Sequence, residues 1–333
     1  MSPLSTPPQL TRRTALAFAV ALGTATFHGL TLARSSTGTT GTVDVRHARG
    51  NARVAANPQR VVAYDLASLD IMQSLQLPVA GVPRAAFPQY LQGFGDHARY
   101  PIAGSLFDPD FDALSRIRPD LILVGGRSAA RSETLARIAP TLDMSTRGTQ
   151  LLEDMGRNVQ ALASLYGKQA QGEQLMKQVH DDIAELKPIT AKAGRGLLVL
   201  AINDKLSPQA PGTRFGLLHD VLGVQPALAA DKVPARGQPF TMDDIARIDP
   251  DWLYVIDRNA ATGSAAGGGV AIASEKVFDN ATIRATTAGK RGQVVFLDPK
   301  GWYLMGSAAP TAMIQNVRQI RGALTANSAA SAA

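Results

Sequence analysis

The stretch KQAQGEQLMKQVHDDIAELK, residues 168–187, lies between Gly167 and Pro188, two residues that commonly end helices. Apolar residues recur in it at steps of four, four and three, on one face of a helix: Leu175, Val179, Ile183 and Leu186. Opposite charges lie four residues apart on the other face, in the pairs Glu173–Lys177 and Lys177–Asp181. Such a helix would be about 30 Å long, the width of a small domain. The pattern alone fits a connector between two lobes or an ordinary surface helix, and the α/β character of both flanking segments favours the connector.

Length and charge narrow the class of protein. A chain of 333 residues, 45% of them hydrophobic, is long enough for two domains with full cores. It contains no cysteine, so we expect no disulfide, no thiolate metal site and no lipid-anchored cysteine. The formal charge of +7 falls to 7 − 2 = +5 without Arg12 and Arg13, which suits an anionic partner. The basic residues are scattered, so no nucleic-acid partner is expected.

The N-terminus has the pattern of an export signal. Arg12 and Arg13 precede an uncharged, mildly apolar run that ends in small residues, Thr31-Leu32-Ala33. Adjacent arginines favour the twin-arginine route, which exports folded proteins. We therefore predict a signal peptide at residues 1–33, a flexible leader at 34–42, and a soluble mature protein in the periplasm without a lipid anchor.

The remaining chain alternates predicted strands and helices. After a hairpin at 43–54, the expected strands are 60–64, 79–82, 121–124, 196–202, 252–256 and 293–297. The expected helices are 68–77, 111–117, 150–166, 215–222, 241–248 and 308–324. This alternation predicts an α/β fold with mainly parallel sheets: two Rossmann-like lobes, 43–167 and 189–324, joined by one long helix at 168–188. The low-complexity tail, 325–333, is expected to fray.

An internal repeat links the two predicted lobes. Residues 113–129 align with residues 244–260 at an offset of 131, without a gap, and seven of the seventeen positions are identical. Each copy contains a helix, a Pro-Asp turn, a strand and then an arginine, Arg127 or Arg258. Ligands of open α/β sheets bind at the carboxyl ends of strands, so both arginines are expected to face one cleft. Alternatively, each arginine forms a salt bridge within its own lobe.

The chain from about residue 43 to 324 resembles the periplasmic substrate-binding proteins of ATP-binding-cassette importers for ferric siderophores, in particular the catecholate branch. The resemblance is carried by short segments in a fixed order: Asn57 to Val62, Gly104 to Asp110, Arg118 to Ile122, Gly125 to Ala129, Gly212 to Gly216, Pro250 to Trp252, Asp257 to Asn259, Leu297 to Pro299, and Trp302 to Leu304. It implies two α/β lobes, a long connecting helix and a shallow cleft, the helical-backbone form of a periplasmic binding protein.

The resemblance also implies a basic triad for an anionic ligand, at Arg127, Arg214 and Arg258. Guanidinium groups stay charged, donate to aryl oxygens and stack on aryl rings, which suits a ferric tris-catecholate. Arg214 could instead only begin the helix before Phe215.

Some relatives complete the iron shell with a histidine and a tyrosine from the protein. The tyrosine position matches Tyr303, whose phenolate would be a hard ligand for ferric iron, or else a packed core residue. Arg236 stands where the histidine is expected, so we expect a ligand with saturated iron, or recognition by charge alone. Trp302 joins the candidate site, packed under the same loop, as a fluorescence reporter.

Acidic side chains of this family dock onto the membrane permease. Asp112 and Asp243 are equivalent under the offset of 131 and are the candidates, with Asp244 as a substitute. The alternative for both is a solvated carboxylate at a helix start, stabilised by the positive end of the helix dipole.

No motif of a catalytic or metal site is present. His47, His97, His180 and His219 lack metal-ligand spacing, and no nucleophile elbow or phosphate loop occurs. We expect a monomeric binding protein without an intrinsic cofactor, not an enzyme, that takes a ferric siderophore to an ABC permease. The alternatives are a haem or cobalamin carrier and a two-lobed extracytoplasmic enzyme with an anionic substrate.

Overall fold

The structure is a computed structural model that describes residues 41–203, 205–235, 238–263, 274–305 and 308–331, with side chains described as far as Ala326. The predicted signal peptide, most of the leader, Arg236 and most of the glycine-rich loop at 263–269 lie outside these ranges. None of the described helices is both long and apolar enough to cross a bilayer.

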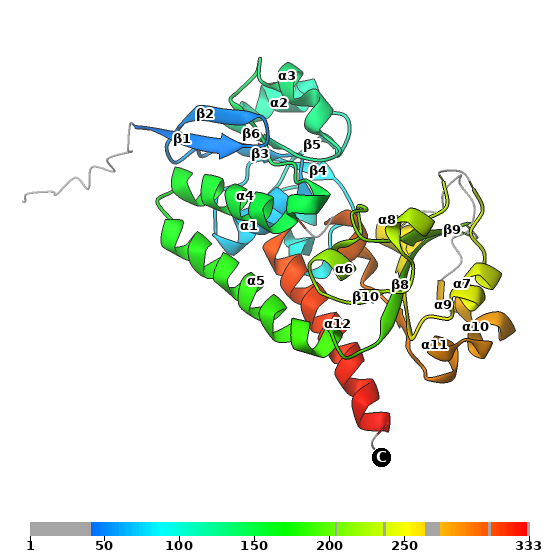
Figure 1. The fold of residues 1–333 in the computed structure, drawn as a ribbon. Helices are drawn as coiled ribbons and strands as arrows, with labels where there is room; N and C mark the ends of the chain where they lie inside the picture. The colour runs from blue at the N-terminus through cyan, green and yellow to red at the C-terminus, as the bar shows by residue number, and fades with distance from the viewer. Residues whose placement is uncertain (1–40, 204, 236–237, 264–273, 306–307, 332–333) are drawn as a thin grey trace, which may run out of the picture. The chain divides into compact units, whose positions relative to one another are not determined.

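Each half of the chain has a mainly parallel sheet, as the alternation of elements predicted, and β1 and β2 form a separate antiparallel hairpin (Figure 1). In the N-terminal lobe, the order is β3-β6-β7, and a parallel bridge between Val62 and Gly81 brings the pair β4-β5 alongside β3. In the C-terminal lobe, the order is β10-β8-β11-β12, and β9 pairs with β8 antiparallel. The strands of the N-terminal lobe are β1 (Thr42–His47), β2 (Gly50–Ala55), β3 (Val61–Ala63), β4 (Val82–Arg84), β5 (Ile102–Ser105), β6 (Leu121–Val124) and β7 (Thr141–Asp143). Those of the C-terminal lobe are β8 (Arg195–Ile202), β9 (Lys205–Gln209), β10 (Gln225–Pro226), β11 (Trp252–Asp257) and β12 (Val294–Phe296).

Helices cover the sheets and connect the strands. In the first part of the chain they are α1 (Leu66–Ser74), η1 (Gln89–Gly95), α2 (Phe111–Ile117), η2 (Ala129–Arg131), α3 (Ser132–Leu135), η3 (Gly148–Gln150), α4 (Leu151–Leu165) and α5 (Gln169–Thr190). In the second part they are α6 (Leu217–Asp220), η4 (Ala230–Lys232), α7 (Met242–Ile248), α8 (Arg258–Thr262), α9 (Ser274–Phe278), α10 (Ala281–Ala285), α11 (Thr287–Lys290), the π-helical turn η5 (Lys300–Leu304) and α12 (Pro310–Ser331).

The long helix α5 carries the chain from the first sheet to the second, as predicted, and packs against α4 and α12 (Figure 1). Its buried face is centred on Met176, Val179, Ile183 and Leu186, while Leu175 is only half-buried. One apolar core continues from α1 and β3 through α4, α5 and α12 to β8 and β11. The two lobes therefore share packed side chains along the connector.

Pro188 does not end α5, contrary to prediction. The helix continues to Thr190, which is buried and whose hydroxyl donates to the Leu222 carbonyl at 2.8 Å. A proline in the last turn is tolerated here because this tertiary contact holds the end of the helix. The frayed tail is also a wrong prediction as far as Ser331, because α12 continues through residues 325–331. Alanine has the highest helix propensity, and this segment is rich in it.

The internal repeat is confirmed in the backbone. α2 and α7 occupy equivalent residues at the offset of 131, with Asp110 and Thr241 as their N-caps. Both helices end in a left-handed residue, Arg118 with φ 51° and Asp249 with φ 46°. The reversal at this residue turns the chain into the Pro-Asp segment and the next strand.

The aspartate of each Pro-Asp turn explains why the motif recurs. Asp120 accepts from the backbone N–H groups of Gln59 (2.9 Å) and Arg60 (2.8 Å), just before β3 begins. Asp251 accepts from the N–H of Arg195 (2.8 Å), where β8 begins. In both lobes the carboxylate therefore fixes the start of the neighbouring parallel strand, which sets the register of the sheet.

Candidate functional site

A cavity of about 540 Å³ lies at the carboxyl ends of β3, β6 and β7, where a ligand of an α/β sheet is expected. Segments of the C-terminal lobe, near α6 and η5, complete it. The lining residues come from both halves of the chain: Asp65, Gly125, Gly126, Arg127, Met144, Ser145, Thr146, Gly148 and Leu151, and then Gly212, Thr213, Arg214, Leu217, Leu304, Met305 and Ala308.

Two of the predicted arginines meet in this cavity. Arg127 follows β6 and donates to the carbonyl oxygens of Tyr303 and Leu304, both at 3.3 Å. Arg214 comes from the segment before α6 and donates to the same Tyr303 carbonyl at 2.8 Å. Guanidinium groups from both lobes thus converge on the last turn of η5, although the cleft predicted from the repeat paired Arg127 with Arg258, which is not among the lining residues.

The electrostatics of the pair favour an anion. Burial and the nearby charge of Arg214 lower the pKa of Arg127, while Tyr303 and Asp65 partly offset the effect. An arginine stays protonated despite such a shift. The free energy spent on holding two cations close together would be recovered when an anion binds between them.

Tyr303 lies beside the two arginines, and its ring packs against side chains of the protein. The ring stacks on Phe215 with centroids 5.9 Å apart, and the Arg214 guanidinium lies 4.9 Å from its centroid. Arg214 also lies 4.6 Å from the centre of the Phe215 ring. Tyr303 does not contribute to the cavity lining. Its role as a ferric ligand stays a prediction, and no cluster of three or more His, Asp or Glu able to hold a metal occurs in the described residues.

Two other candidates lie outside the cavity lining. Arg258 begins α8, which packs against η5, and its Nη1 lies 3.5 Å from Oδ1 of its neighbour Asn259. Trp302 is fully buried, and its indole N–H donates to Gln319 at 3.3 Å, so it packs under the loop as expected and its place among the ligand-binding residues stays a prediction. Arg236 lies outside the described residues.

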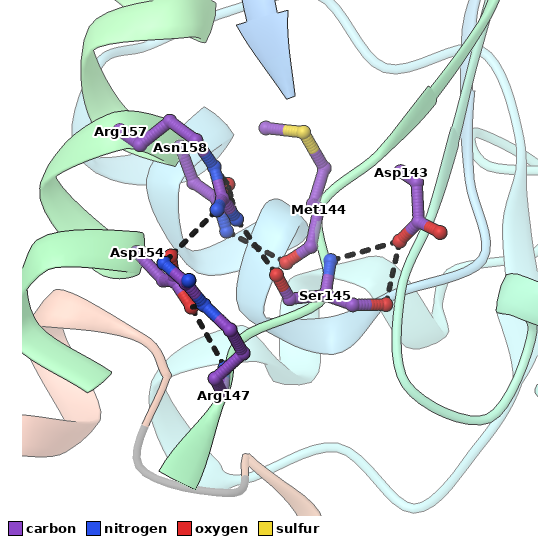
Figure 2. Close-up of polar contacts among 7 residues, drawn as sticks. All are labelled: Asp143, Met144, Ser145, Arg147, Asp154, Arg157 and Asn158. Carbon is purple, nitrogen blue, oxygen red and sulfur yellow. Dashed lines mark hydrogen bonds and ion pairs between the residues drawn. The ribbon is translucent and has the colours of Figure 1, made fainter. Parts of the chain in front are cut away.

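One wall of the cavity, residues 144–148, is held by polar side chains of α4, among them Asp154, which pairs with Arg147 of the wall itself (Figure 2). Asp154, with a side chain only 1% exposed, binds Arg147 and Arg157 through its Oδ1, each at 2.6 Å. Arg157 also donates to the Ser145 carbonyl at 2.7 Å, and Asn158 donates to the Met144 carbonyl at 2.6 Å. These bonds hold residues 144–148, the wall segment, against α4.

Ser145 joins this wall to the loop that carries Arg127. Its hydroxyl donates to Asp143 and accepts from the Gly126 N–H at 3.0 Å. On α4, the hydrogen bond from Arg147 is the chief cause that lowers the pKa of Asp154, so this carboxylate is charged at neutral pH. The position of Arg127 is thereby linked to α4 through hydrogen bonds and ion pairs.

Several lining residues were missed by the sequence analysis. Asp65 follows a predicted strand, so the rule that ligands bind at strand ends could have identified it. Ser145, Thr146 and Gly148 follow β7, a strand of three residues that gave no periodic signal. Thr213 lies one residue before Arg214, inside a segment already singled out.

The two candidate docking residues lie where the repeat placed them. Asp112 and Asp243 are exposed in the first turns of α2 and α7. Asp244 is half-buried, forms the capping box of α7 with Thr241 and pairs with Arg247, so it is engaged within its own helix.

Comparison with known proteins agrees with this architecture. Residues 61–300 match the model of a family described as periplasmic binding protein. The petrobactin-binding protein YclQ of Bacillus subtilis is 31% identical, over 85% of this chain and 88% of that protein. The ferric-anguibactin-binding protein FatB of Vibrio anguillarum is 27% identical, over 79% and 82% of the two chains. The crystal structure of YclQ superposes with a TM-score of 0.78 over 85% of this chain and 98% of that one. The chain therefore belongs to the periplasmic binding protein family.

Proposed function

We propose that this protein binds an anionic ferric siderophore of the catecholate class and delivers it to an ABC permease. The observation that carries the proposal is the convergence of Arg127 and Arg214, from different lobes, at one cavity of about 540 Å³. Two guanidinium groups can donate to aryl oxygens and stack on aryl rings, and the apolar part of the lining, which includes Leu217 and Met305, accommodates the rest of an aromatic ligand.

The relatives support the type of ligand. YclQ and FatB carry names that state binding of petrobactin and of ferric anguibactin. A 25% identical neighbour, VctP of Vibrio cholerae, is titled a periplasmic catecholate-siderophore binding protein and superposes with a TM-score of 0.74. All three titles describe binding proteins, which supports a carrier rather than an enzyme.

The export signal and the exposed acidic residues indicate where the protein would act. Residues 1–33 would direct export by the twin-arginine route, which places the mature protein in the periplasm. Asp112 and Asp243, exposed on equivalent helices, would then dock onto basic sites of the permease.

A ligand screen tests the proposal. The mature protein would be titrated, by tryptophan quenching, with a ferric tris-catecholate, a ferric hydroxamate, ferric citrate, haem and cobalamin. Trp302 lies in η5, directly before Tyr303, and should report occupancy. We expect tightest binding of a ferric catecholate, weakened by added salt. Binding of haem or cobalamin alone, or of no member of the panel, would contradict the proposal.

A further inference from the structure

An acidic side chain lines the cavity beside the two arginines. Asp65, which follows β3, contributes to the same lining as Arg127 and Arg214. It is the one acidic residue among the lining residues in the described part of the chain. A carboxylate here repels an anionic ligand, so its presence is unfavourable for a ligand that carries only negative charge.

Helix capping does not account for the charge. Asp65 is the N-cap of α1 and accepts from the backbone N–H of Ser68 at 2.9 Å and from the Ser68 hydroxyl at 2.8 Å. Asparagine and serine cap helices about as well as aspartate. Burial also raises the pKa of Asp65, which the bonds from Ser68 and the charge of Arg127 only partly offset. The ionisable group is thus kept at a cost that an asparagine would avoid.

The carboxyl is close to the Arg127 loop, although Arg127 is directed elsewhere. A Cβ atom on Gly125 would lie 2.9 Å from Cγ of Asp65, so the glycine provides the room for this approach. The Arg127 guanidinium donates to the carbonyls of Tyr303 and Leu304 instead. Arg127 therefore does not use its described hydrogen bonds to neutralise Asp65.

We infer that Asp65 accepts a hydrogen bond from a protonated amine of the ligand, while Arg127 and Arg214 hold its anionic ferric centre. This inference rests on the proposed function and narrows the ligand to a ferric catecholate that also carries a cationic nitrogen. An amine beside the carboxyl favours its ionised form, and a charge-assisted bond is about twice as strong as a neutral one.

A matched pair of ligands crossed with one substitution tests the inference. The first ligand is the ferric bis-catecholate with dihydroxybenzoyl groups on both terminal nitrogens of spermidine, whose central amine is protonated. The second is the same complex with the central amine acetylated. Wild-type protein should bind the amine form about 5- to 10-fold more tightly, as expected for one charge-assisted bond that replaces a bond to water. Asp65→Asn, which preserves the cap, should reduce the preference to below about 2-fold.

The control is Asp110→Asn, the same change at the N-cap of α2, outside the cavity lining. It should leave the preference of the wild type intact. If the wild type binds both complexes equally, or if Asp65→Asn weakens both by the same factor, the inference is overturned and the proposed function stands. If none of the ferric complexes binds the wild type, the proposed function fails and the inference fails with it.

Discussion

Arg127 and Arg214 donate hydrogen bonds to one carbonyl oxygen, that of Tyr303, from the N-terminal and the C-terminal lobe respectively. The shared acceptor fixes the distance between two cations that would otherwise repel each other. A ligand that binds beside them meets a prearranged pair of donors, which lowers the cost of ordering side chains on binding.

Removing one of these cations should cost affinity more than stability. Arg127→Ala removes a charge that is partly buried next to Arg214, so relief of repulsion should offset part of the lost hydrogen bonds. We expect affinity for the ferric ligand to fall about 10- to 100-fold, as for loss of one or two charge-assisted bonds. Fluorescence titration measures the affinity and thermal unfolding the stability. Arg53→Ala, at an exposed ion pair on the hairpin, is the control and should change neither.

Asp154 should matter for the wall of the cavity and for stability together. Asp154→Asn leaves Arg147 and Arg157 without their shared anion, in a site where the carboxylate is almost fully buried. We expect the free energy of unfolding to fall by about 2–4 kcal/mol, somewhat less than for a fully buried ion pair, because the Arg147 side chain is 56% exposed. Ligand affinity should fall as well, because residues 144–148 lose their support.

The comparison for this variant is Asp181→Asn, which breaks the exposed pair with Lys177 on α5. Exposed pairs contribute at most about 1 kcal/mol. Urea unfolding measures the loss of unfolding free energy in both variants. An equal loss in the two would contradict the stabilising role of the Asp154 network.

The place of Arg127 could be predicted from the sequence, because the helix, Pro-Asp turn and strand before it form a local pattern that occurs twice in the chain. The Pro-Asp turn and the strand after it placed Arg127 at a sheet edge without any structure. The C-terminal copy was less reliable: Arg258 lies at the equivalent strand end, but its side chain does not line the cavity. Backbone equivalence therefore did not determine where the side chain points.

The remaining lining depended on tertiary contacts that leave no local signal. β7 has only three residues, and the wall after it is defined by side chains of α4 that reach back to it. Trp302 was included in the candidate site as a residue packed under the same loop, and its side chain is fully buried in the core. The extension of α5 past Pro188 likewise depends on the contact between Thr190 and Leu222.

Asp70 should make stability depend on pH between about 4 and 6. This buried carboxyl accepts from the N–H groups of Thr311 and Ala312, at the start of α12, and from the Tyr90 hydroxyl. Burial raises its pKa to about 6. In this window the folded state holds a proton that the unfolded state has lost, so stability falls as the pH rises.

Asp70→Asn should remove this dependence. The difference in unfolding free energy between wild type and variant should change by up to about 3 kcal/mol from pH 4 to pH 7, since one pKa unit corresponds to about 1.4 kcal/mol. Groups common to both proteins cancel in this difference. Urea unfolding at several pH values measures it, and a difference independent of pH would contradict the assignment.

Docking should depend on Asp112 and Asp243 together. Reversing both charges, as Asp112→Lys with Asp243→Lys, should abolish uptake of the ferric ligand by whole cells and leave its affinity for the purified protein intact. Glu173→Lys, at an exposed position on α5, is the matched charge reversal and should leave uptake unchanged. Normal uptake by the double variant would remove the docking role.

Ligand binding should change the arrangement of the lobes very little. The lobes share one apolar core along α4, α5 and α12, and a hinge would have to break these contacts. Small-angle scattering should give the same radius of gyration, within error, with and without the ferric ligand. A clear contraction would show a hinge that the packing does not predict.

The most direct measurement is a crystal structure of the protein with its ferric ligand, with iron located by anomalous scattering. The account predicts one iron peak in the cavity lined by Arg127 and Arg214, with ligand oxygens in hydrogen-bonding distance of both guanidinium groups. An iron peak outside this cavity, or ligand oxygens that contact neither arginine, would contradict it.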